Sequence, residues 1–188
     1  MTMIAEPSSS ASTAPGYRIR LIGPAEATAC REALIELLVD AVEGGASVNF
    51  IWPMTQEKAA RWWQGALASH ASGERLIFVA ETADGRIDGT VQLIPAGKEN
   101  QPHRADLAKM LVHRRARRQG LGAALLRTAE AEALRRNMTL LILDTEASSP
   151  GEHLYASQGW IKFGEVPGYA LSADGSKAEP ASFFYKVL

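Results

Sequence analysis

The chain has 188 residues, of which 46% are hydrophobic and 22% charged, and its formal net charge is −1 at pH 7. These values are ordinary for a globular protein, and so small a net charge gives no general attraction to nucleic acid or to acidic membranes. Any anion-binding site must therefore come from a local patch of charge. The single cysteine, Cys30, excludes an internal disulfide and is compatible with a reducing cytoplasm.

The first segment, residues 1–16, is small, polar and contains proline, so we expect a disordered tail there and one domain over residues 17–188. The segment lacks the positive start and the apolar stretch of a secretory signal. No apolar run approaches the roughly 20 residues that a membrane span needs. These features predict a cytoplasmic protein that does not contact a membrane.

The spacing of apolar residues then predicts strands and helices in turn. Expected strands cover residues 17–22, 75–82, 87–95, 104–113, 139–145, 160–169 and 182–188, and expected helices cover residues 34–42, 55–69, 120–136 and 150–158. The segment 139–145 is nearly all apolar, as expected for the buried middle of a sheet. Together the elements predict one α+β domain with a mixed, mostly antiparallel sheet of about six to seven strands, flanked by about four helices.

The stretch VHRRARRQGLGAALL, residues 112–126, has four arginines and a histidine within six residues, followed by two glycines at the start of an expected helix. The first turn of a helix has backbone N–H groups without internal partners and a partial positive charge. Gly120 and Gly122 carry no side chains that would keep an anion away from those groups, and Arg117 and Arg118 add positive charge. The stretch is therefore typical of a phosphate or pyrophosphate site.

Other interpretations of this stretch stay open. It is not a P-loop, which needs Gly-x-x-x-x-Gly-Lys-Ser/Thr, and it is not Gly-x-Gly-x-x-Gly because residue 125 is leucine. ATP, GTP and the dinucleotides are therefore disfavoured. A basic run before a helix is often only a solvated loop. Basic clusters also contact nucleic acid, but no aromatic residue lies among these arginines.

The segment Arg117-Arg118-Gln119-Gly120-Leu121-Gly122 resembles the acetyl-CoA signature Gln/Arg-x-x-Gly-x-Gly/Ala of the GCN5-related N-acetyltransferase (GNAT) family. The order of the surrounding elements follows the same plan over residues 17–188, and LYASQGW resembles the family's Leu-Tyr-x-x-x-Gly-Phe. The segments HRADLAKMLVHRRARRQGLG, LDTEASSPGEHLYASQGW and GEVPGYALSADG look closest to the tabtoxin-resistance-like acetyltransferases. The resemblance implies a single GNAT-like domain.

The resemblance also implies that acetyl-CoA is the co-substrate and indicates which residues hold it. In the family, the strand before the signature pairs with the pantetheine arm through backbone groups, at the positions of Met110, Leu111 and Val112. The residues expected at the pyrophosphate are Arg117, Arg118, Gln119, Gly120, Leu121, Gly122 and Ala123. Residues 113–115 would meet the 3′-phosphate of the adenosine end or point into water. No metal site is predicted.

Acetyl transfer from a thioester to an amine needs a base for the amine proton and an acid for the leaving thiolate. Tyr155 occupies the family position of that acid; the alternative is an aromatic packing residue. Asp144 and Glu146 would share one face of an extended strand and are candidate bases. Asp106 or an ordered water is the alternative, and structural roles stay open for all three acids. Ser148 stands where the family has an asparagine, which weakens the case for side-chain contacts to the pantetheine there.

The resemblance places the acceptor pocket between the first two helices, their connecting loop and the C-terminal hairpin. Phe50 and Trp52 fall in that loop, and Trp62 and Trp63 follow on the second helix. Neighbouring residues on a helix point about 100° apart, so at most one of these two tryptophans can face the core. Such aromatic residues either wall an amine pocket or fill the core.

These inferences predict an acetyl-CoA-dependent N-acetyltransferase for a primary amine of a small molecule, amino-acid-like or antibiotic-like by analogy. One alternative is a protein or peptide N-acetyltransferase, because an open groove and a walled pocket have no distinct sequence pattern. The other is a non-catalytic acyl-CoA-binding sensor, against which Tyr155 and the neighbouring acids argue. We expect no nucleic-acid partner, and the sequence allows a homodimer.

Overall fold

The computed structural model of the protein describes residues 13–188. Within them, Thr13–Ala14 form a short strand, β1, that pairs antiparallel with β2 (Tyr17–Leu21). The prediction of a tail through residue 16 is therefore wrong for residues 13–16, because Gly16, with a φ of +78°, lets the chain reverse between the two strands. The rest of the predicted tail, residues 1–12, lies outside the described residues.

The described residues continue through strands, α-helices and two short 3-10 helices. In chain order these are η1 (Pro24–Glu26), α1 (Ala27–Glu43), α2 (Gln56–Ala71), β3 (Leu76–Thr82), β4 (Ile87–Pro95), β5 (Arg104–Val112), η2 (Arg114–Ala116), α3 (Leu121–Arg135), β6 (Leu140–Glu146), α4 (Pro150–Ser157), β7 (Ile161–Leu171) and β8 (Ala178–Val187). Every predicted strand and helix is present, although α1 and β8 begin earlier than predicted. No helix in this part of the chain is long and apolar enough to cross a membrane.

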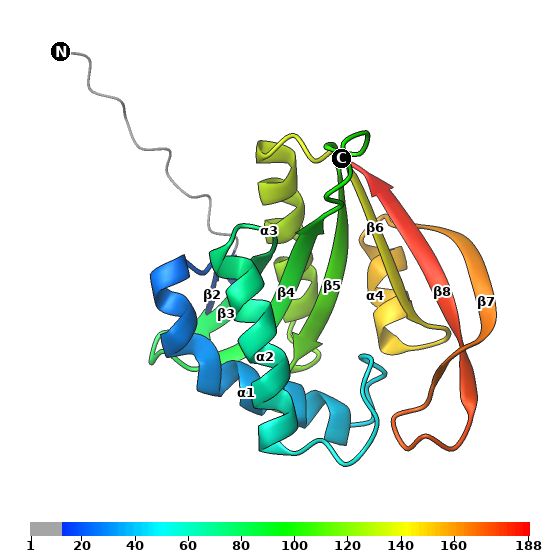
Figure 1. Cartoon of the computed structure of the whole chain (residues 1–188), viewed down its shortest axis with the longest axis horizontal. Helices are drawn as coiled ribbons and strands as arrows, with labels where there is room; N and C mark the ends of the chain where they lie inside the picture. The colour runs from blue at the N-terminus through cyan, green and yellow to red at the C-terminus, as the bar shows by residue number, and fades with distance from the viewer. Residues whose placement is uncertain (1–12) are drawn as a thin grey trace.

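The strands form one sheet in the order β1-β2-β3-β4-β5-β6-β8-β7. All neighbouring strands pair antiparallel except β5 and β6, which are parallel. The predicted α+β fold with a mixed, mostly antiparallel sheet is confirmed. The parallel pairing covers only residues 104–106 and 140–142, and beyond it β5 and β6 diverge (Figure 1).

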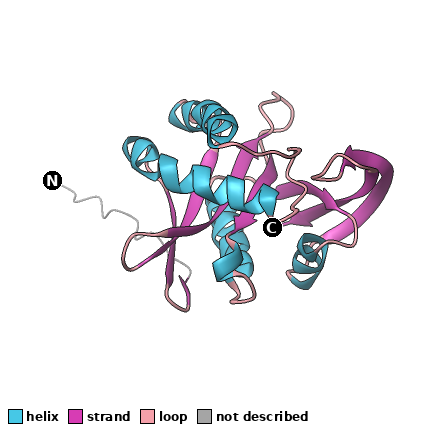
Figure 2. Cartoon of the chain, turned by 90° about the horizontal axis from the view of Figure 1, so that it is seen from below, coloured by secondary structure: helices cyan, strands magenta, loops and turns pink. Residues whose placement is uncertain are grey.

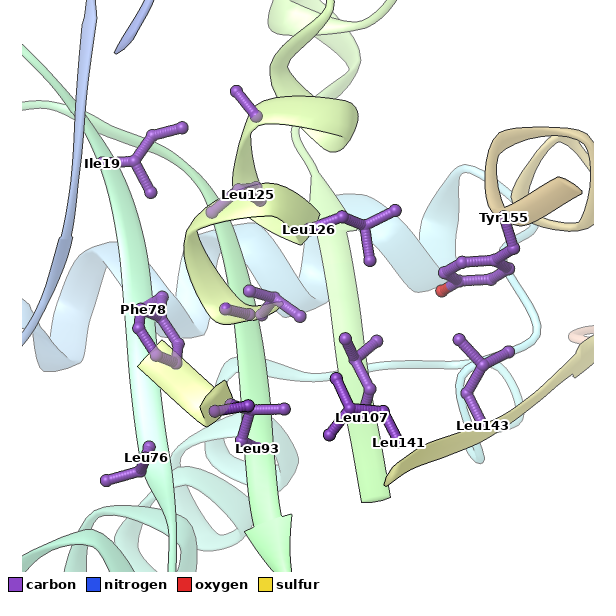
Figure 3. Close-up of a cluster of buried hydrophobic side chains, with 14 of the residues drawn as sticks. Ile19, Leu76, Phe78, Leu93, Leu107, Leu125, Leu126, Leu141, Leu143 and Tyr155 are labelled. Atoms are coloured by element: carbon purple, nitrogen blue, oxygen red, sulfur yellow. The ribbon is translucent and has the colours of Figure 1, made fainter. Parts of the chain in front are cut away.

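A hydrophobic core lies on each face of the sheet. One core packs α3 and α4 against the sheet through residues such as Phe78, Leu125 and Leu143 (Figure 3). The other packs α1 and α2 against the opposite face, around the fully buried Trp63. Figure 2 shows the helices on the two sides of the sheet. The diverging parts of β5 and β6 are therefore supported by helices from both sides.

Side chains cap the helices that frame this region. Thr55 Oγ1 accepts a hydrogen bond from the Lys58 N–H at 3.2 Å, which confirms the predicted start of α2. Ser149 Oγ accepts from the Glu152 N–H at 3.2 Å, and Pro150 occupies the first turn of α4. Such caps satisfy donors that the helix itself leaves free, so both helix starts are fixed by local sequence.

Candidate active site

The divergence of β5 and β6 leaves one edge of β5 without a strand partner among the described residues. β6 pairs with β8 along its length, whereas its pairing with β5 stops at Ile142. Met110, Leu111 and Val112, predicted to lie beside the pantetheine, belong to the diverging part of β5. Backbone groups on such an edge can pair with an extended ligand as they would with another strand.

A bulge interrupts β5 at Lys109, which has a φ of +49°. The register with β4 shifts at this place, between Thr90 and Gln92. A bulge bends its strand and re-aims a side chain. Here Lys109 Nζ reaches the loop between α1 and α2 and donates to the Val48 carbonyl at 3.1 Å. The bulge thus directs a charged side chain out of the strand beside the predicted pantetheine edge.

The N-terminus of α3 follows β5 after a short basic loop. Gly120 caps the helix in the left-handed conformation with a φ of +77°, and Arg118 has a φ of +63°. The first bond of the helix runs from the Ala124 N–H to the Gly120 carbonyl at 3.1 Å. Earlier N–H groups of the first turn have no partner inside the helix. Together with the partial positive charge of the helix end, these donors can hold an anion.

The two glycines of this turn differ in what they allow. A Cβ on Gly122 would lie 2.9 Å from Leu154 Cδ2. The missing side chain therefore makes room for α4, a reason for this glycine in addition to the predicted approach of an anion. A Cβ on Gly120 would meet nothing within 4 Å, but its φ of +77° disfavours a larger residue. One glycine is therefore needed for helix packing and the other for backbone conformation.

The basic loop before α3 is held by acidic residues that the sequence analysis did not connect with it. The carboxylate of Asp40 in α1 accepts from the Arg114 backbone N–H at 2.9 Å and from its Nε at 2.7 Å. Arg115 Nε donates to Asp88 Oδ1 at 2.6 Å, and its Nη1 donates to Glu36 Oε1 at 2.8 Å. These two arginines fasten the loop to α1 and β4, although both side chains stay partly in solvent.

Asp88 is the most buried acid of this group, with a side chain that is 0% exposed. Burial alone would raise the pKa of its carboxyl group. Hydrogen bonds from Arg86, Tyr17 and Arg115 outweigh burial and lower the pKa of Asp88 below its ordinary value. The carboxylate therefore stays charged. An acid inside the apolar segment 87–95 was the available sequence signal for this role.

Arg117 and Arg118 differ from the arginines before them. Arg117 Nε donates to the Val112 carbonyl at 3.1 Å, across the end of β5. Arg118 is exposed and lines a groove between the start of α3 and α4. The groove has a volume of about 450 Å³ and is also lined by Ser148, Pro150, His153, Leu154 and Ser157. Ser148, where the sequence departs from the family pattern, thus lies on the groove.

Tyr155 lies on α4 and is 6% exposed. Its ring packs against Trp160 and Phe184, with centroid separations of 5.9 and 6.1 Å. Figure 3 shows its hydroxyl pointing from α4 toward β5. Burial, and after it the charge of Asp144, raise the pKa of Tyr155. The ring is therefore a packing element, while the hydroxyl stays protonated and is directed toward the diverging strand.

Asp144 and Glu146 alternate along β6 with Leu143, which belongs to the core under α4. Both acids consequently project from the opposite face of the strand. Asp144 is exposed, whereas Glu146 is half-buried. Burial, and after it the charge of Glu179, raise the pKa of Glu146. The two candidate bases thus share a face but differ in their surroundings.

Asp106 is placed differently from these two acids. It lies where β5 and β6 still pair, and its carboxylate forms an ion pair with Arg104 at 2.5 Å. Asp144, by contrast, lies in the diverging part of β6. Its charge adds to the effect of burial in raising the pKa of Tyr155, and it opposes part of the lowering of the Lys109 pKa by burial and Arg75. Asp144 is therefore the candidate base on the diverging part of β6, whereas Asp106 is paired with Arg104 where the strands still join.

The loop between α1 and α2 contacts the connection between β7 and β8. The Trp52 backbone N–H donates to the Ala173 carbonyl at 2.8 Å. The Trp52 indole Nε1 donates to the Val42 carbonyl, at the end of α1, at 2.6 Å. The loop and the C-terminal hairpin, both expected around the acceptor, therefore lie against each other.

Of the two adjacent tryptophans, Trp63 is fully buried and Trp62 is half-buried, as the helix spacing predicts. Trp62 packs edge-on against Phe50, with ring centroids 5.9 Å apart. Lys109 Nζ lies 5.2 Å from the Trp62 centroid and 5.6 Å from the Phe50 centroid. Burial, and after it the charge of Arg75, lower the pKa of Lys109 to about 8. Lys109 was not among the predicted site residues, although a lysine within the otherwise apolar LAKMLV was a signal.

The sequence model of the acetyltransferase (GNAT) domain matches residues 73–162. The matched residues begin just before β3 and end in β7, so they include the diverging strands, the start of α3 and α4. The diverging strands and the helix start therefore lie inside the matched domain, whereas α1, α2, the loop between them and β8 lie outside it.

Solved structures share the fold over nearly the whole chain. The ribosomal-protein-alanine N-acetyltransferase from Brucella melitensis is 26% identical, with a TM-score of 0.70, over 90% of this chain and 99% of that chain. A GCN5-related N-acetyltransferase from Kribbella flavida is 20% identical, with a TM-score of 0.73, over 93% and 99%. A Salmonella typhimurium protein solved with its cofactor acetyl-CoA is 18% identical, with a TM-score of 0.71, over 92% and 94%. Residues 73–162 thus match the acetyltransferase (GNAT) domain, and the chain shares its fold with the solved acetyltransferases named above.

Proposed function

We propose that the protein is an acetyl-CoA-dependent N-acetyltransferase that moves an acetyl group directly to a primary amine of a small molecule. One observation carries the proposal: the free first turn of α3 closely follows the β5 edge that lacks a partner among the described residues. A thioester with an amide-containing arm and a pyrophosphate needs both a strand edge and a group of anion-binding donors. The acetyl-CoA complex of the Salmonella typhimurium protein supports this choice of cofactor.

In this proposal the cofactor extends from β5 to α4. Its pantetheine amides pair with the backbone of residues 110–112, and its pyrophosphate accepts hydrogen bonds from the N–H groups of residues 118–123. Arg117 and Arg118 add positive charge beside those donors. The groove lined by Arg118 and His153 then takes the adenosine end.

The reaction joins the acceptor nitrogen to the acetyl carbon and breaks the bond from that carbon to sulfur. Tyr155 donates its hydroxyl proton to the departing sulfur, a role supported by the direction of the hydroxyl and by its protonated state. Asp144 or Glu146 takes the amine proton, directly or through a water. Asp144 is supported by its electrostatic effect on Tyr155, and Glu146 by its raised pKa, which suits a base that works nearer neutral pH.

The contact between Trp52 and Ala173 supports a small acceptor. It joins two segments that a long peptide would have to pass between, so an enclosed pocket is favoured over an open groove. The Brucella melitensis protein is a ribosomal-protein-alanine N-acetyltransferase, and a protein N-terminus is therefore the alternative acceptor. The proposal includes the resemblance to the tabtoxin-resistance-like acetyltransferases. That resemblance rests on the segments at residues 103–122, 143–160 and 164–175.

The outer strand β7 supports a homodimer. Phe163 and Tyr169 are 57% and 50% exposed, and both rings pack beside Phe183 of β8. A long edge strand with apolar side chains in solvent is a surface that other chains can cover. Light scattering should give the mass of a dimer for the wild type and of a monomer for Phe163→Lys, and a monomeric wild type would contradict the dimer.

Calorimetry with acetyl-CoA tests the cofactor proposal. Gly120→Val should weaken binding, because it distorts the left-handed turn that presents the N–H groups. Gly73→Val is the matched control, since Gly73 also has a positive φ, of +82°, but follows the far helix α2. ATP and NAD should not compete. A folded wild type that binds no CoA ester, or equal affinities for the two variants, would contradict the proposed site.

A further inference from the structure

Two positively charged side chains lie together beside the diverging strands. Lys109 Nζ donates to the Val48 carbonyl at 3.1 Å and lies 5.2 Å from the Trp62 centroid. The Arg75 guanidinium lies over the same ring, 6.0 Å from its centroid. Within residues 13–188 the hydrogen-bond partners of these two cations are a backbone carbonyl and the Gln92 amide oxygen, without a carboxylate. The pair therefore has no negative partner in direct contact.

Nitrogen donors in the same place lack acceptors. Arg75 Nη1 donates to Gln92 Oε1, which fixes the orientation of that amide. Arg75 Nε and Gln92 Nε2 are buried and have no hydrogen-bond partner in the described part of the chain. Both atoms are donors only, and leaving a buried donor unpaired is unfavourable. The site thus supplies charge and donors and is short of an acceptor.

The electrostatics of the site point in the same direction. Burial and the charge of Arg75 lower the pKa of Lys109, and Asp144 partly opposes them. Burial also lowers the pKa of Arg75. An anion between the two cations would offset their repulsion and accept from their donors. Asp144 lies on the neighbouring strand β6, in the part that diverges from β5.

We propose that the acceptor is an amino carboxylate, whose carboxylate binds to Lys109 and Arg75 above Trp62 and whose amine lies toward Asp144. The inference rests on the proposed acetyl transfer, because the amine must reach the thioester. It places the negative group of the acceptor beside two cations and its ammonium group beside an acid. The half-buried Phe50 and Trp62 rings border the two cations.

A purely structural role would explain some of the same contacts. Lys109 could serve only to fasten the loop between α1 and α2 through the Val48 carbonyl. Loss of such a tether would affect all acceptors alike. Loss of a carboxylate site affects only acceptors that carry a carboxylate, so paired acceptors separate the two roles.

The first experiment compares L-α-amino acids with their amides, which keep the amine and the side chain but lose the negative charge. Values of kcat/KM are calculated from the concentration of the unprotonated amine, which is the reactive form. The wild type should prefer the acids by roughly tenfold to hundredfold in kcat/KM, the range of a hydrogen bond between charged groups. Lys109→Met should abolish that preference, because the acids lose the charge contact as well as the tether to Val48, whereas the amides lose the tether alone. Lys98→Met, an exposed lysine between β4 and β5, is the matched control and should change neither. Equal losses for acids and amides in Lys109→Met would overturn the inference.

The second experiment needs no turnover. Calorimetry with 3-phenylpropionate and with 3-phenylpropanamide compares a carboxylate with its uncharged analogue. The wild type should bind the carboxylate more tightly, and Lys109→Met, with its fold checked by near-UV circular dichroism, should bind the two equally. A wild type that does not distinguish the probes would overturn the site. Preference for the carboxylate without acetylation of any amine would leave the site in place and overturn the proposed transfer.

Discussion

Leu154 of α4 lies so close to Gly122 of α3 that a Cβ atom on Gly122 would come within 2.9 Å of Leu154 Cδ2. We therefore expect Gly122→Ala to push α4 outward and to lower the free energy of unfolding by about 1–3 kcal/mol, the usual cost of overpacking. Leu154→Ala in the same chain should recover part of that loss, because it removes the clashing methyl group. Denaturant unfolding of the single and double variants measures both effects. Additive losses in the free energy of unfolding would show that the added methyl group at residue 122 does not contact Leu154.

Tyr155→Phe removes one hydroxyl and keeps the ring that packs against Trp160 and Phe184. We expect kcat to fall roughly tenfold to several hundredfold, within the range of general acid catalysis, with little change in affinity for acetyl-CoA. Because burial raises the pKa of Tyr155, its deprotonation should not contribute an alkaline limb to the pH–rate profile near neutrality. An unchanged kcat with chemistry rate-limiting would leave Tyr155 with a packing role alone.

Arg118 is exposed beside the start of α3, whereas Arg114 and Arg115 are held by acids. Arg118→Ala should raise the KM for acetyl-CoA roughly twofold to fivefold, the scale of an exposed charge contact, and salt should reduce the difference. Arg136→Ala, at the far end of α3, makes the same change in net charge and should leave that KM unaltered. Matching effects of the two variants would mean that Arg118 acts only through overall charge.

Lys109 should make acceptor binding depend on pH. Its pKa in the folded chain is about 8 instead of 10.5, because burial and Arg75 outweigh Asp144. Lys109 is therefore charged below about pH 8 and neutral above it, so the KM for an amino carboxylate should rise as pH increases through 8. Between pH 8 and 10.5 the unfolded chain binds more protons at this site, so the contribution of Lys109 to stability should rise with pH. Both trends should be absent in Lys109→Met; their persistence would assign them to another group.

Local sequence predicted most of the fold, because most elements follow from apolar spacing and capping. The apolar stripe of α1, the Thr55 cap and the burial of one of the two adjacent tryptophans all appear as expected. The short strand at Thr13 was missed, because two residues have no period and the pairing depends on β2.

The candidate site was harder to predict where it depends on contacts between distant segments. The pattern at Gly120 indicated a helix start with free donors, and that geometry is present. The fastening of Arg114 by Asp40 spans 74 positions along the chain, and no local pattern indicates it. The same holds for Lys109, whose placement depends on a bulge in β5 and on Trp62 in another helix.

The most direct test of the account is to follow release of the CoA thiol and formation of an acetylated amine in one reaction with acetyl-CoA and a panel of small amines. We predict equal amounts of thiol and of N-acetylated product, identified by mass spectrometry, with the reaction slowed in Tyr155→Phe. Release of thiol without an acetylated amine, or no release from a folded protein that binds acetyl-CoA, would contradict acetyl transfer at this site.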